Sequence, residues 1–339
     1  MKRLILTTVG TSIFDETKHK GNCEFSVCGG EAFRKTCDNA QKAGLTSRDA
    51  LLGRWEGPYA TQLGNQESVW LDMQATATCG DGDKVWALSA ELSSLKLLDP
   101  RPGEGDRLVL LATDTVQGAV AARRAALHGS TSPEVLVWKE GVHWPESCDD
   151  CSACLADASD RVRDEHGPRF PRASVQVMII EGLTWDPRDR TNRRPADDFR
   201  DQGCYNLAAA LTSIIAYERD EYSIVCNVTG GLKSAIPFMT WVAALDRGLF
   251  KREAELMYLY EYSETLLRTR LPALVLPPEV FEFFKDPSCP DATPDHARIQ
   301  DVQDYYELSA GKWHLTSFGQ VVKSAVKIKV ARDDLCPQP

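Results

Sequence analysis

Short apolar runs alternate with helical segments along most of this chain, and no other feature constrains its fold as strongly. Strands are expected at 3–9, 107–112, 134–138, 174–180, 222–226 and 255–260, where the residues are apolar and rich in β-formers. Helices are expected at 85–98, 116–127, within 197–217 and at 233–246. Parallel neighbours need crossover helices, so this order predicts an α/β fold with a doubly wound, mostly parallel sheet.

Two stretches interrupt the alternation and are interpreted as insertions, near 15–83 and 143–173. After residue 278 the composition changes, and Pro287, Pro290 and Pro294 indicate a linker. The tail, about 298–332, is expected to form a helix, then the segment 313–319, then a second, basic helix. We therefore predict a main domain over 1–278 and a small winged-helix-like domain over 279–339.

The charge balance limits the classes of ligand. Lys and Arg number 39 against 49 Asp and Glu, for a net charge of -10, which argues against sequence-blind binding to long nucleic acid. No run approaches the roughly 18 apolar residues that span a bilayer, and no signal peptide precedes the first strand, so we expect a cytoplasmic protein. The 11 cysteines are an odd number spread along the chain, and we expect most to be reduced thiols.

A glycine-containing loop follows the strand expected at 222–226. In Asn227-Val-Thr-Gly-Gly-Leu-Lys-Ser234, the two glycines Gly230 and Gly231 let backbone N–H groups approach a phosphate at the start of a helix, and Lys233 adds a positive charge. The loop is not a Walker A motif, because Leu232 precedes the lysine and Asn227 replaces the first glycine, so nucleoside-triphosphate hydrolysis is disfavoured. The alternative is an ordinary tight turn between strand and helix.

Two other expected strands end in polar loops. Thr8-Val-Gly-Thr-Ser12 follows the first strand, where Gly10 eases the turn and Thr11 and Ser12 present hydroxyl and amide groups. Asp114 and Thr115 follow the strand at 107–112, and they either contact a ribose or base, or Asp114 caps the next helix. Ligands of such sheets bind at the carboxyl ends of the strands, so the three loops predict a site for a phosphate-bearing nucleotide.

Five segments, taken in order, resemble the CRISPR-associated Rossmann-fold (CARF) proteins of type III systems. They are the loop TVGTS at 8–12, LSAEL at 88–92, LATDT at 111–115, NVTGGLK at 227–233 with Ile236-Pro237, and YEYSE at 260–264 leading to Leu271-Pro272. The resemblance covers residues 1 to about 278 and implies a Rossmann-like domain. It also implies a homodimer that binds a cyclic oligoadenylate across its interface, which suits a two-fold symmetric pair of loops.

With no larger effector domain apparent, the chain is most similar to the standalone ring nucleases of that family. The resemblance implies metal-independent cleavage of the ring, expected to be cyclic tetra-adenylate, to linear products with a 2′,3′-cyclic phosphate, without a cofactor. It assigns catalysis to two residues: Ser12 would orient the attacking hydroxyl or bind the phosphate, and Lys233 would stabilise the developing charge. The phosphate cradle would contain Gly10, Thr11, Thr229, Gly230 and Gly231, with Asn227, Asp114 and Thr115 beside it.

Three alternatives remain open from the residues. Arg161 and His166 have the spacing of a HEPN ribonuclease signature, but Pro168 and Pro171 follow, and a solvated charge run explains them as well. A ligand-gated DNA-binding regulator would use the basic helix near 319–332, whose charges a solvated helix face also explains. A dimeric sensor would bind the messenger without cutting it.

One cysteine cluster raises the question of zinc. His143, Cys148, Cys151 and Cys154 offer four ligands, but their spacing is not that of paired zinc knuckles. A thiol-bearing loop is the interpretation we prefer, so no metal site is expected.

Overall fold

The computed structural model describes residues 2–10, 30–65, 68, 89–103, 105–129, 134–138, 159–162, 174–183, 203–217, 222–260, 263, 265–286, 292–293, 302–309 and 312–335. The statements below concern these residues.

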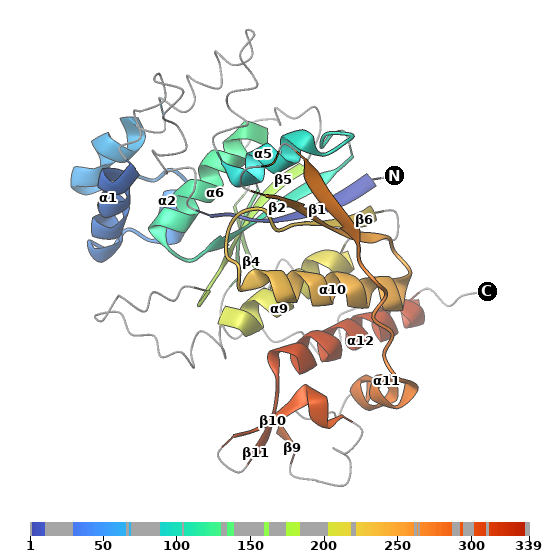
Figure 1. Cartoon of the computed structure of the whole chain (residues 1–339). Helices are drawn as coiled ribbons and strands as arrows, with labels where there is room; N and C mark the ends of the chain where they lie inside the picture. Colours follow the sequence, from blue (N-terminus) through green and yellow to red (C-terminus); the bar gives the residue numbers. More distant parts are fainter. Residues whose placement is uncertain are drawn as a thin grey trace.

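An eight-stranded sheet lies at the centre of the described chain, in the order β4-β3-β5-β2-β1-β6-β7-β8 (Figure 1). The strands from β3 to β7 in this order run parallel, while β4 and β8 are antiparallel at the two edges. Their bounds are β1 Lys2–Thr8, β2 Arg107–Thr113, β3 Glu134–Trp138, β4 Ser159–Val162, β5 Ser174–Ile180, β6 Tyr222–Asn227, β7 Ala254–Leu259 and β8 Leu266–Arg270. The predicted mostly parallel α/β sheet is confirmed.

The central strands are apolar on both faces, as expected for strands that helices cover on each side. In β1, Leu4 and Leu6 lie in one buried cluster, whereas Ile5 lies in the other. Side chains of a strand alternate between the faces of the sheet, so a continuous apolar run supplies both cores at once.

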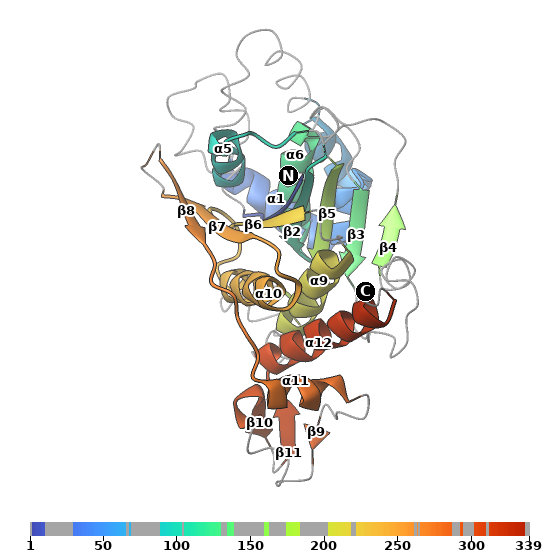
Figure 2. The same ribbon diagram turned by 90° about the vertical axis from the view of Figure 1, so that its right-hand side faces the viewer.

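Two layers of helices cover the sheet, one on each face (Figures 1 and 2). One core contains residues of α1 (Gly30–Lys42), α2 (Ser47–Leu51), α5 (Ala90–Leu97) and α6 (Val116–Gly129). The opposite core contains residues of α9 (Cys204–Tyr217) and α10 (Ala235–Phe250). The helices that follow β1 and β2 therefore lie on one face, and those that follow β5 and β6 lie on the other.

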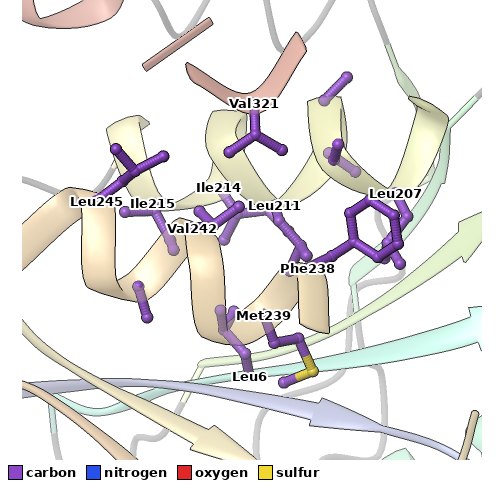
Figure 3. Packing of buried hydrophobic residues seen from close by; sticks show 14 of the residues in the cluster. Leu6, Leu207, Leu211, Ile214, Ile215, Phe238, Met239, Val242, Leu245 and Val321 are labelled. Atoms are coloured by element: carbon purple, nitrogen blue, oxygen red, sulfur yellow. The ribbon is translucent and has the colours of Figure 1, made fainter. Parts of the chain in front are cut away.

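A further helix, α12 (Ser317–Leu335), packs on the outer side of α9 and α10. Figure 3 shows Val321 of α12 above α9 side chains such as Leu211 and Ile214, with Met239 of α10 directed toward Leu6 of β1. The core thus continues from the sheet into the C-terminal segment. The predicted boundary at residue 278 stays a prediction.

The rest of the C-terminal segment forms a small layer beyond α12 (Figure 2). It contains α11 (Pro278–Lys285), a 3-10 turn η8 (Gln303–Tyr305) and a three-stranded sheet in the order β10-β11-β9. The strands are β9 Ala292–Thr293, β10 Tyr306–Ser309 and β11 Lys312–Leu315, and the paired strands are antiparallel. The winged-helix-like description of this segment stays a prediction.

The expected helix at the start of the tail is wrong over 306–309. Tyr306–Ser309 forms the strand β10 instead, which pairs with β11 from Tyr306 opposite Leu315 to Ser309 opposite Lys312. Other elements were not predicted at all: α11 lies where a linker was expected, β8 forms the sheet edge, and α1 and α2 lie in the stretch interpreted as an insertion. Proline begins α11 at a position where its missing N–H is harmless.

No helix within the described part of the chain is long and apolar enough to cross a membrane.

Candidate functional site

The strands β1 and β6 are neighbours in the sheet, yet the chain leaves them toward opposite faces. From β1 it continues to α1, α2 and α5 on one side, and from β6 it enters α10 on the other. The strand order of the sheet reverses where two neighbouring strands continue to opposite faces. Ligands of open α/β sheets bind in the crevice that forms at this place, at the carboxyl ends of the strands. The two loops singled out in the sequence are the two loops at this point.

The loop after β1 is described as far as Gly10. Val9 continues the pairing with β2, since its N–H donates to the carbonyl oxygen of Leu111 at 2.9 Å. The N–H of Gly10 donates to Oε1 of Glu91 at 2.6 Å. Thr11 and Ser12, predicted for the cradle and for catalysis, lie outside the described residues.

The loop after β6 is fixed by its own polar side chains. Asn227 is fully buried, its Oδ1 accepts the N–H of Thr229 at 3.2 Å, and its Nδ2 donates to Oγ of Ser94 in α5 at 2.9 Å. Oγ1 of Thr229 accepts the N–H of Leu259 at the end of β7, at 2.9 Å. In this conformation Asn227 and Thr229 tie the loop to α5 and β7, and Asn227 is enclosed instead of facing solvent.

The two loops touch each other. Oγ1 of Thr8 donates to the carbonyl oxygen of Gly230 at 2.5 Å. A Cβ atom on Gly10 would lie 2.8 Å from the backbone nitrogen of Gly231, and one on Gly231 would lie 2.5 Å from the carbonyl carbon of Thr8. Gly231 also has φ +80, which L side chains rarely adopt. The glycines therefore permit the backbones of the two loops to approach each other closely.

The start of α10 adds the positive end of a helix to this pair of loops. Ala235 begins the helix, and its N–H closes a turn on the carbonyl oxygen of Leu232 at 3.0 Å. Lys233 is exposed just before that start, and no ion pair of its ammonium group is recorded within the described residues. The helix dipole and this cation both favour an anion at the loop.

Glu91 belongs to the site, although the sequence interpretation assigned it no role. It lies in the first turn of α5, which Ser89 caps by accepting the N–H of Leu92 at 3.1 Å, and it is 1% exposed. A Cβ on Gly230 would fall 2.1 Å from its Oε1, so the carboxyl group lies against Gly230 as well as Gly10. The sequence did contain a signal for Glu91, because this charged residue stands between two apolar residues, Ala90 and Leu92, in the segment 88–92.

Asp114 and Thr115 stand at the exit of β2, one strand away from β1. Oγ1 of Thr115 accepts the N–H of Gly118 at 2.9 Å, so Thr115 is the residue that caps α6. Oδ2 of Asp114 accepts the N–H of Gly182 at 3.0 Å and joins the exits of β2 and β5. The cap of α6 is therefore supplied by Thr115 and not by Asp114 as expected, whereas the contact of Asp114 with a ribose or base stays a prediction.

The other candidate sites fall largely outside the described residues. His143, Cys148, Cys151 and Cys154 all do, as does His166, whereas Arg161 lies in the edge strand β4. Among the residues that the structure describes, no group of three or more His, Cys, Asp and Glu is placed to hold a metal ion.

Residues 173–274 match the family model of a CRISPR-associated protein, Cas_APE2256. The matched range begins just before β5 and includes α9, β6, the loop 227–234, α10, β7 and β8. This match confirms the CRISPR association that the ordered segments predict. No curated protein matches the chain.

Proposed function

Because residues 173–274 match a CRISPR-associated family, we propose that this protein is a ring nuclease that binds cyclic oligoadenylate at the loops after β1 and β6. The observation that carries the proposal is the contact between these loops, with the helix start of α10 and Lys233 beside it. The expected ring is cyclic tetra-adenylate. A two-fold dimer would present two such loop pairs to a ring whose phosphates repeat with even symmetry.

The proposed reaction needs no group beyond the substrate and the protein. A ribose 2′-oxygen attacks the adjacent phosphorus and loses its proton, the bond from phosphorus to the 5′-oxygen breaks, and that oxygen takes up a proton as it leaves. Rings open to linear products with a 2′,3′-cyclic phosphate. The protein's task is to hold the in-line geometry and to stabilise the added negative charge.

Lys233 is the described residue suited to charge stabilisation. Its exposed ammonium group lies on the loop between Gly231 and the start of α10, at the end of the helix that favours anions. By resemblance, Ser12 would orient the attacking hydroxyl. Gly230 and Gly231 would bring backbone N–H groups to the phosphate.

An aromatic side chain beside the cradle is suited to hold a base. Tyr260 is 55% exposed and directly follows Leu259, whose N–H is bound by Thr229 of the loop. Adenine rings stack on aromatic faces with useful affinity, so Tyr260 is proposed to support one base of the ring.

The test is to incubate the purified protein with cyclic tetra- and hexa-adenylate in EDTA and to separate the products. We expect linear products carrying a 2′,3′-cyclic phosphate, lost in Lys233→Ala and kept in the matched control Lys285→Ala, whose lysine lies on α11 and pairs with Glu282. Binding without cleavage would refute the nuclease activity and favour a sensor that binds the messenger without cutting it. Absence of binding would refute the proposal as a whole.

The regulator alternative is tested by DNA retention with and without the messenger. The apolar side of α12, including Val321, Val322 and Val326, is buried, so only its other side is available to DNA. Retention that depends on Lys323 and Lys327 would favour a regulator over a nuclease.

A further inference from the structure

Ser234 stands directly before α10, in the position where a serine normally caps a helix. The hydroxyl of such a residue accepts the N–H of the second or third helical residue, and its backbone is extended. Two other helices of this protein follow the rule. Ser89 is extended, with φ -144 and ψ 156, and its Oγ accepts the N–H of Leu92 at 3.1 Å. Thr46 is extended as well, and its Oγ1 accepts the N–H of Asp49 at 3.1 Å.

Ser234 departs from this rule, because the first turn of α10 leaves it no N–H to bind. Its backbone lies in the α region, with φ -66 and ψ -19, and its side chain makes no capping bond. The second residue of the helix, Ile236, donates its N–H to the carbonyl oxygen of Lys233 at 3.2 Å. The third is Pro237, which has no N–H. Among the described residues, the buried Oγ of Ser234 has no hydrogen-bond partner.

A buried hydroxyl without a partner lowers the stability of a fold, so its presence at a particular place needs a physical reason. This hydroxyl follows Lys233, whose exposed ammonium group and helix start favour an anion. The N–H groups of Ala235 and Ile236 are engaged within the turn, and Pro237 has none, so these three residues offer no N–H to a ligand. The hydroxyl of Ser234 is a donor that the turn does not use.

We propose that Ser234 is a further ligand-binding residue, whose hydroxyl donates a hydrogen bond to an anionic oxygen of the phosphate held at Lys233. Oγ is covered in this conformation, whereas the residue as a whole is partly exposed. A serine side chain has three staggered positions about its Cα–Cβ bond, so a rotation turns the hydroxyl toward the anion without moving the backbone. The inference rests on the proposed function for the identity of the ring.

The experiment removes the hydroxyl and measures stability and binding separately. Ser234→Ala should not lower the urea midpoint of the protein without ligand, because the hydroxyl has no bond to lose. The same variant should bind cyclic tetra-adenylate about tenfold more weakly in titration calorimetry, because a hydrogen bond to a charged phosphate is lost. Inorganic phosphate is the second probe, and it should raise the urea midpoint of wild-type protein more than that of Ser234→Ala.

Thr46→Ala is the control, because it removes a cap bond that is formed. It should lower the urea midpoint and leave the affinity for the ring unchanged. A lower midpoint of Ser234→Ala, or its failure to fold, overturns the inference, since the hydroxyl would then be bonded within the protein itself.

The two proposals fail in different ways. Equal affinity of Ser234→Ala and wild-type protein for the ring overturns the inference and leaves the proposed function standing. If wild-type protein does not bind the ring, the proposed function fails and the phosphate probe decides about Ser234. A larger phosphate-dependent shift of the midpoint in wild-type protein then supports the inference, and equal shifts in the two proteins overturn it.

Discussion

Thr8 and Gly230 are separated by 222 positions in the sequence, yet the hydroxyl of Thr8 donates to the carbonyl oxygen of Gly230 at 2.5 Å. This bond joins the ends of two neighbouring parallel strands, β1 and β6, at the point where the chain turns toward opposite faces of the sheet. The two loops consequently form one surface. A substitution in either loop is therefore expected to change the conformation of both loops.

Gly231→Ala is expected to disturb that surface. The substitution forces a left-handed conformation on a residue with a side chain, which costs about 1–2 kcal/mol, and its Cβ would also lie 2.5 Å from the carbonyl carbon of Thr8. We expect a lower free energy of unfolding and loss of cyclic tetra-adenylate binding. Urea denaturation and titration calorimetry measure the two effects.

Gly44→Ala is the matched control. Gly44 has φ +100, but nothing lies within 4 Å of the position of its Cβ. It should lose only the conformational part of the stability and should bind the ligand as wild-type protein does. Equal losses in both variants would mean that the contact with Thr8 adds nothing.

Much of the sheet could be predicted because parallel strands buried on both faces have a distinctive sequence. The strand β2, for example, is a continuous apolar run from Leu108 to Ala112, and glycine or a polar loop ends several of the strands. The edge strand β8 escaped prediction for the same physical reason. Its residues Leu267, Arg268 and Arg270 are exposed, so no burial pattern marks it.

The site could be predicted only in part. The glycines and Lys233 were recognisable, because a loop between a strand and a helix needs small residues to approach a phosphate. The roles of Glu91 and Asn227 depend on α5 lying over the ends of β1 and β6, a contact between segments distant in the sequence. Asn227 in particular was expected near the ligand, whereas its amide binds Ser94 inside the protein.

The link between Asn227 and Ser94 should be measurable as an energetic coupling. Asn227→Ala leaves the buried hydroxyl of Ser94 and the N–H of Thr229 without this partner, at an expected cost of about 1–3 kcal/mol. Ser94→Ala removes the other side of the bond. In a double-mutant cycle by urea denaturation, we expect the double variant to lose less stability than the sum of the two single variants. Strict additivity would show that the bond is energetically unimportant.

Cys226, next to Asn227, should make stability depend on alkaline pH. Burial, and to a smaller extent the carboxylates of Asp246 and Glu255, raise the pKa of its thiol from 9.0 to about 12. Between pH 9 and about 12 the folded protein keeps a proton that the unfolded chain releases. The free energy of unfolding therefore falls with rising pH, by at most about 1.4 kcal/mol per pH unit for this group.

Cys226→Ala removes this pH-dependent contribution to the free energy of unfolding, which acts only above about pH 9. We expect its free energy of unfolding to fall less steeply than that of the wild type when guanidinium denaturation is repeated from pH 9 to 11. Parallel curves for the two proteins over this range would contradict the assignment.

Arg252 and Glu253 follow α10, and the first forms a buried ion pair whereas the second forms an exposed one. Nε of Arg252 donates to the two carboxylate oxygens of Asp246 at 3.1 and 2.9 Å, and both side chains are 2% exposed. Asp246→Ala leaves the guanidinium buried without this partner and should cost about 3–5 kcal/mol in thermal or chemical denaturation. Glu253→Ala breaks an exposed pair with Arg270, and its melting temperature should stay near that of the wild type. Similar losses in both variants would show that burial does not decide the effect.

Tyr260 provides the test of how the bases are held. Its side chain is 55% exposed at the end of β7, where the N–H of Leu259 is bound by Thr229, and an adenine in the cradle can stack on its ring. Loss of one stacked base costs about 1–3 kcal/mol, so Tyr260→Ala should weaken binding of cyclic tetra-adenylate by about 5- to 150-fold. Tyr260→Phe keeps the ring and should bind within about twofold of the wild type, since stacking does not need the hydroxyl. Tyr258→Ala is the control, because Tyr258 is also exposed on β7 but lies within the strand rather than beyond its end. If Tyr260→Phe and Tyr260→Ala weaken binding equally, the hydroxyl holds the ligand through a hydrogen bond and stacking is refuted. If neither variant weakens binding, Tyr260 does not hold a base.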